Sequence, residues 1–99
     1  MAPAVSIITP TFNRHTLLQA QHTIVASQTV TDFEWLILDD GPEPCAYFER
    51  VSDPRIRYQH LGAAPMLVSA KRNWLCERAT APVIAQFGEA EPERDDVAE

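Results

Sequence analysis

The stretch Phe33–Pro42, F-E-W-L-I-L-D-D-G-P, decides the fold class of this 99-residue chain. Its apolar run ends in two adjacent carboxylates, Asp39 and Asp40, a pattern typical of a buried strand that opens into a polar loop. Paired charges at the end of a buried strand are costly unless water, a metal, a base or a sugar lies just beyond them. We therefore interpret Asp39 and Asp40 as part of a binding site at the carboxyl end of a strand.

Three other short runs predict strands: residues 5–9 (V-S-I-I-T), 56–61 (I-R-Y-Q-H-L) and 82–87 (P-V-I-A-Q-F). The first should stop at Pro10, and the last tolerates a proline at its first position. Apolar residues at helical spacing predict helices over 15–28 and 65–79, and a short helix fits within 42–51. The expected inward-facing residues of the two longer helices are Leu17, Leu18, Ala20, Ile24 and Val25, then Met66, Leu67, Ala70, Trp74 and Leu75.

The alternation of strands and helices predicts the α/β class. We expect a Rossmann-like three-layer sandwich around a mainly parallel sheet of about four strands, in the order 3-2-1-4. Ligands of such sheets bind at the carboxyl ends of adjacent strands. The loops Pro10–Arg14 and Asp39–Pro42 should therefore meet at one edge of the sheet.

The charge of the chain divides it into two parts. The formal net charge is −6, but residues 1–87 hold eight Asp and Glu against seven Lys and Arg, whereas residues 88–99 hold six against one. We predict an α/β domain over 1–87 and a flexible acidic tail over 88–99. Without a cationic stripe, nucleic acid is not an expected partner. No apolar stretch approaches the ~20 residues that span a bilayer and no signal peptide is evident, so we expect a cytoplasmic protein.

Five segments occur in an order and spacing similar to those of family-two glycosyltransferases. They are V-S-I-I-T-P-T-F-N-R at 5–14, D-F-E-W-L-I-L-D-D-G at 32–41, D-P-R-I-R-Y at 53–58, S-A-K-R-N-W-L at 69–75 and A-P-V-I-A-Q-F at 81–87. The resemblance covers nearly all of residues 4–87. It implies the nucleotide-sugar-binding half of a GT-A fold, which takes UDP-, GDP- or dTDP-sugars as substrates, usually with Mg²⁺ or Mn²⁺.

The resemblance also implies roles for individual residues. Pro10, Thr11, Phe12 and Asn13 would form one wall of the nucleotide pocket. Asp39 would accept a hydrogen bond from the base, as an ionised carboxylate can, and Asp40 would face the ribose. Arg72 would lie beside the pocket, where a guanidinium can orient a carboxylate or contact the diphosphate.

The chain departs from the family pattern after the fourth strand. Relatives carry aspartates there that hold the metal on the diphosphate, but this chain has Gly88, Glu89, Ala90 and Glu91. We therefore expect no metal site, unless Glu89 and Glu91 form a degenerate one with their longer side chains. The acceptor site and catalytic base of relatives lie in a further domain's worth of residues. The resemblance thus implies a truncated domain that binds nucleotide but has little or no turnover alone, and it assigns no catalytic residue.

Other interpretations stay open. The chain could be a non-catalytic interaction module that associates through the exposed sheet edge of strand 82–87, including as a homo-oligomer. Arg72 could instead be a surface residue that pairs with Glu77 or Asp40. A response-regulator receiver is disfavoured, since its acidic cluster should involve the first strand as well and no lysine follows a late strand. A dinucleotide-dependent dehydrogenase is disfavoured, since the turn P-T-F-N-R at 10–14 is no glycine-rich phosphate loop. Trp35 and Trp74 are expected in the core, and Cys45 and Cys76 are expected to be reduced.

Overall fold

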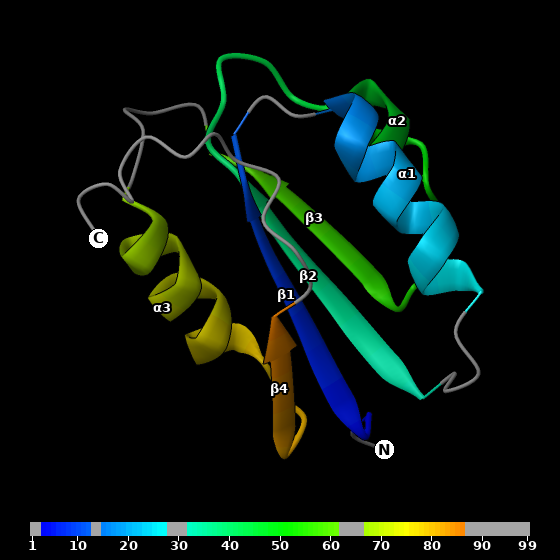
Figure 1. Ribbon diagram of the computed structural model, residues 1–99, viewed down its shortest axis with the longest axis vertical. Helices are drawn as coiled ribbons and strands as arrows, with labels where there is room; N and C mark the ends of the chain where they lie inside the picture. The colour runs from blue at the N-terminus through cyan, green and yellow to red at the C-terminus, as the bar shows by residue number, and fades with distance from the viewer. Residues whose placement is uncertain (1–2, 13–14, 28–31, 62–66, 87–99) are drawn as a thin grey trace.

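The computed structural model describes residues 3–12, 15–27, 32–61 and 67–86. Its elements are β1 (Val5–Thr11), α1 (His15–Ala26), β2 (Phe33–Asp39), α2 (Ala46–Glu49), β3 (Ile56–His60), α3 (Val68–Arg78) and β4 (Val83–Gln86). The strands form one parallel sheet in the order β3-β2-β1-β4. Figure 1 shows α1 and α2 on one side of this sheet and α3 on the other. The predicted three-layer α/β fold and its strand order are confirmed.

Strand β2 is the centre of the molecule, because all seven of its residues are buried. Side chains of a strand alternate between the two faces of its sheet. Trp35 and Ile37 pack with residues of α1 and α2, while Leu36 and Leu38 pack with Leu75 of α3. The continuous apolar run of the sequence therefore supplies two cores, one on each face.

The register of the parallel strands fixes which residues meet at the carboxyl edge. Pairing of β1 with β2 runs without a slip from Val5 opposite Phe33 to Thr11 opposite Asp39, and Asp39 in turn lies opposite His60 of β3. The predicted meeting of the ends of the first two strands is therefore confirmed.

A buried carboxylate anchors the opposite edge of the sheet. Glu34 Oε2 accepts hydrogen bonds from Ser6 Oγ at 2.5 Å and from the Thr80 amide and hydroxyl at 2.7 and 3.0 Å. Its other oxygen lies 3.4 Å from the Arg57 guanidinium. Burial alone raises the pKa of Glu34, but these hydrogen bonds and the charge of Arg57 outweigh it, so the pKa lies below its ordinary value. Glu34 thus links β1, β2 and the connection from α3 to β4.

Two predicted strand properties need correction. Strand β1 does not stop at Thr9 but continues through Pro10 to Thr11. Within the described part of the chain, pairing with β4 ends at Ile8, before Pro10, which has no N–H to donate. Strand β4 begins at Val83 and not at the predicted Pro82, and it is exposed throughout, with Val83 and Ile84 retaining 54% and 44% of their surface. Phe87, predicted as its last residue, lies outside the described residues.

The predicted helix faces also need correction. In α1 the buried residues are Leu18, Gln21 and Val25, while Leu17, Ala20 and Ile24 are exposed. A helix packed on a sheet buries a narrow stripe, and the polar Gln21 lies within it. In α3 the helix begins only at Val68, and Leu67 precedes it with 64% of its surface exposed. Gln28, Pro65 and Met66, which the prediction placed in these helices, lie outside the described residues.

Trp35 and the two cysteines agree with expectation. Trp35 is fully buried and its indole N–H donates to the Thr9 hydroxyl at 2.9 Å. Trp74 is half-buried against the core on the α3 face. Cys45 and Cys76 are both free thiols.

Candidate functional site

Asp39 lies at the carboxyl edge, on the α1 and α2 face of the sheet. Its Oδ1 accepts a hydrogen bond from the Gly41 amide at 2.9 Å, and its Oδ2 accepts one from the Tyr58 hydroxyl at 2.7 Å. His15 Nε2, at the start of α1, lies 3.6 Å from Oδ2. The Asp39 side chain has no exposed surface. These hydrogen bonds leave part of its acceptor capacity, since a carboxylate has about four lone-pair directions.

Tyr58 of β3 holds Asp39 in place from the neighbouring strand. Its hydroxyl donates to Asp39 and accepts a hydrogen bond from the Cys45 amide at 2.7 Å. Burial, followed by the hydrogen bond to Asp39, raises the pKa of Tyr58 well above its ordinary value. The phenol is therefore a neutral donor to the carboxylate.

This arrangement predicts a loss of stability at alkaline pH. In the unfolded chain Tyr58 ionises near pH 10, whereas the folded protein keeps it neutral to higher pH. The folding stability that this difference in pKa provides is fully present below the pKa of Tyr58 in the unfolded chain. It is lost as the pH rises through the pKa of Tyr58 in the folded protein. Urea unfolding from neutral pH to above pH ~10 should show this decline, and Tyr58→Phe should abolish it.

In a Tyr47→Phe variant Tyr58 is the one tyrosine left in the sequence, so an absorbance titration follows the ionisation of Tyr58 alone. We expect no phenolate signal until the protein unfolds. Ionisation of the folded protein at the ordinary tyrosine pKa would contradict the assignment.

Asp40 lies on the opposite face and is paired with a buried lysine of α3. Lys71 Nζ donates to Asp40 Oδ1 at 2.8 Å and to the Thr11 carbonyl oxygen at 3.1 Å, and neither charged side chain has exposed surface. The Asp40 amide also donates to the Thr11 carbonyl oxygen at 3.4 Å. Lys71 thus ties α3 to the ends of both β1 and β2.

The other predicted site residues divide into two groups. Pro10 and Thr11 are buried at the end of β1, Phe12 follows them half-buried, and Arg72 is half-buried on α3. Asn13, Glu89 and Glu91 lie outside the described residues. The alternative pairing of Arg72 with Glu77 or Asp40 stays a prediction. Asp40 bonds Lys71, and Glu77 lies 3.8 Å from Arg78.

The described carboxylates do not fit a divalent metal. Ranges 3–12, 15–27, 32–61 and 67–86 contain no group of three or more His, Cys, Asp and Glu that could hold one. Asp39 and Asp40 point to opposite faces of the sheet, so their oxygens do not converge on one ion.

The sequence did not lead us to predict that Lys71 and Tyr58 belong to the site at the carboxyl edge. A signal for Lys71 exists, since it precedes Leu75 by four residues and so lies on the same, buried face of the helix. Tyr58 shares the inward-facing positions of β3 with Ile56 and His60. Nothing in the local sequence says that its hydroxyl reaches Asp39.

Residues 6–87 match the family model described as Glycosyl transferase family 2. A search of curated proteins found no match. Over the described residues, no helix has the length and apolar character needed to cross a membrane.

Proposed function

The chain belongs to glycosyltransferase family 2, and from this membership we propose that it binds a nucleotide-diphospho-sugar where β1 and β2 end. The donor would be a UDP-, GDP- or dTDP-sugar. The observation that carries the proposal is the register, which sets Thr11 beside Asp39 with their side chains on the same face of the sheet. This edge is where open parallel sheets bind their ligands.

Each residue of the edge has a role in the proposal. Thr11, with Pro10, Phe12 and Asn13, flanks the base, and Asp39 accepts a hydrogen bond from a base N–H. Asp40 is the proposed neighbour of the ribose, a role that requires its side chain, now buried against Lys71, to become accessible. Arg72 provides a guanidinium for the diphosphate.

Binding at Asp39 requires a local rearrangement, because its side chain has no exposed surface. The Gly41 amide and the Tyr58 hydroxyl are its hydrogen-bond donors, so a base that reaches Asp39 changes the surroundings of both groups. The amide resonance of Gly41 is therefore the most sensitive reporter of nucleotide binding.

The predicted test is a titration with UDP, GDP and dTDP, followed by amide resonances. At least one nucleotide should shift Thr11 and Gly41, and Asp39→Asn should weaken that binding about tenfold, the effect of losing one charge-assisted hydrogen bond. Asp32→Asn is the matched control, since this exposed residue precedes the other end of β2. No shift with any of the three nucleotides, or equal affinity in Asp39→Asn, would refute the proposal.

We further propose that this chain transfers sugar weakly or not at all by itself. Members of the family generally use a divalent metal, which neutralises charge on the departing diphosphate. The positions that should supply its ligands read Gly88, Glu89, Ala90 and Glu91. Donor hydrolysis or transfer should stay at background when Mg²⁺ or Mn²⁺ is added. Efficient turnover would show that Glu89 and Glu91 serve as ligands. Separately, we propose that the protein is located in the cytoplasm.

A second candidate function is association through β4. All four residues of this edge strand are exposed, and two of them are the apolar Val83 and Ile84. An exposed apolar edge strand is a template for pairing with another strand. Sedimentation over a range of concentrations should then show a dimer that Ile84→Lys removes. A strictly monomeric chain would exclude self-association.

A further inference from the structure

A groove on the α3 face of the sheet is lined by none of the residues proposed for the nucleotide site. It has a volume of about 410 Å³ and is lined by residues of β2, β3 and α3. Pockets for small organic ligands fall in the range of about 300–1,000 Å³. The groove is therefore large enough to take such a molecule.

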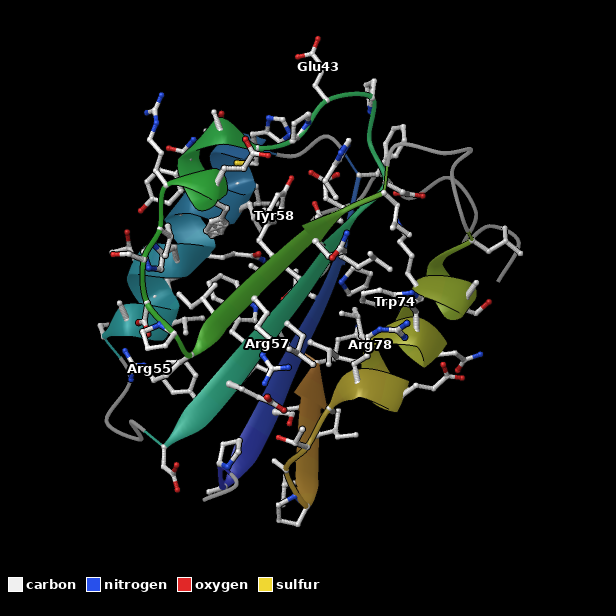
Figure 2. The ribbon with its side chains drawn as sticks, turned by 180° about the vertical axis from the view of Figure 1, so that it is seen from behind. Glu43, Arg55, Arg57, Tyr58, Trp74 and Arg78 are labelled. Atoms are coloured by element: carbon white, nitrogen blue, oxygen red, sulfur yellow. The ribbon has the colours of Figure 1, made fainter. Side chains whose placement is uncertain are left out.

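Two guanidinium groups on separate elements line the groove. Figure 2 shows Arg57 coming from β3 and Arg78 coming from α3. Arg78 lies over the Trp74 ring, 3.7 Å from its centroid, and donates to the Trp74 carbonyl oxygen at 3.0 Å. The ring and the carbonyl together hold this guanidinium in a defined orientation.

Both arginines keep donors for a ligand. A guanidinium has five N–H donors. Arg57 directs one nitrogen to Glu34 at 3.4 Å, and Arg78 uses one for the Trp74 carbonyl oxygen and lies 3.8 Å from Glu77. Their side chains retain 59% and 48% of their surface, so the remaining donors face solvent at the groove.

Apart from Tyr58 and Gln59, the rest of the lining is apolar. Leu36 and Leu75 are buried beneath the groove, and Leu61 is half-buried beside them. The ligand that suits this combination has an apolar body and a compact anionic group. A phosphate monoester fits best, since it is close to a dianion at neutral pH and can accept from both guanidinium groups.

We propose that the groove between β3 and α3 binds a small phosphate monoester with an apolar or aromatic body, held by Arg57 and Arg78. This site is separate from the proposed nucleotide site, because it lies along α3 on the face of the sheet and uses neither Thr11 nor Asp39. Arg57 can be shared with a ligand although Glu34 is near, because their contact is 3.4 Å long, the Arg57 side chain is 59% exposed, and Ser6 and Thr80 hold the Glu34 carboxylate through its other oxygen.

The experiment is a titration with phenyl phosphate, followed by the indole N–H of Trp74 and the amides of Gln59 and Arg78. These resonances should shift, and the affinity should fall about tenfold for each guanidinium removed in Arg57→Gln and Arg78→Gln. Arg50→Gln is the matched control, since Arg50 is exposed at the end of α2 on the other face. Phenol and inorganic phosphate, which each lack one half of the probe, should bind more weakly.

Several results would overturn the proposal. These are the absence of shifts at Trp74 and Gln59, undiminished affinity in both arginine variants, inorganic phosphate binding as tightly as the probe, or shifts confined to Thr11 and Gly41. Arg78→Gln leaves the contact of Arg57 with Glu34 intact, so it decides the question if Arg57→Gln perturbs folding.

Discussion

Replacing Lys71 with methionine is expected to remove about 3–5 kcal/mol of folding stability. The substitution leaves the carboxylate of Asp40 buried with its main cationic partner gone. Small domains have only about 5–15 kcal/mol in total, so this loss is a large fraction of the folding stability and Lys71→Met should unfold at much lower urea. Urea unfolding followed by Trp35 fluorescence measures the difference.

The double variant Asp40→Asn, Lys71→Met is the control for this prediction. Replacing both partners of a buried ion pair is often neutral or stabilising, so the double variant should recover most of the loss. A loss of less than about 1 kcal/mol in Lys71→Met would contradict the buried pair, because exposed ion pairs have effects of that size. Equal destabilisation of the single and double variants would show that methionine itself does not fit.

Replacing Glu34 with glutamine is expected to cost about 2 kcal/mol near neutral pH. The glutamine oxygen can take the place of Oε2 beside Ser6 and Thr80, but it carries no charge, and the amide nitrogen then stands where Oε1 faces the Arg57 guanidinium. The loss should loosen the connection between α3 and β4. Urea unfolding of Glu34→Gln measures it, and the exposed Glu49→Gln should change stability by less than about 0.5 kcal/mol.

The pH dependence gives this prediction a second test. The folded pKa of Glu34 lies below its ordinary value, so its stabilising effect is present above about pH 4.3 and is lost as pH falls through the folded pKa. The difference between the parent and Glu34→Gln should therefore shrink in acid. A difference that is constant from neutral pH to strong acid would mean that the charge of Glu34 has no role.

The fold could be predicted because its signals are local and repeated. The run over residues 33–39 is long enough to mark a fully buried strand, and the alternation of strands with helices restricts the topology to a few parallel arrangements. The contact of Thr11 with Asp39 follows from that topology alone, since parallel strands end at the same edge.

Contacts between distant side chains could not be predicted in the same way. In the K-R-N segment, two adjacent cations differ by about 100° around the helix axis, and the direction of each depends on where the helix packs. The sequence motif drew attention to Arg72, whereas the buried partner of Asp40 is Lys71. Likewise Glu34 interrupts an apolar run, and only the positions of Ser6, Thr80 and Arg57 in the fold explain why a carboxylate is stable there.

The most direct test of the proposed nucleotide site is a nuclear Overhauser measurement between UDP and the chain, with GDP and dTDP measured alongside. We predict cross-peaks from the base protons of at least one nucleotide to the methyl group of Thr11, together with a shifted Gly41 amide. Cross-peaks confined to the α3 groove or to β4, or none with any of the three nucleotides, would contradict a nucleotide site at the ends of β1 and β2.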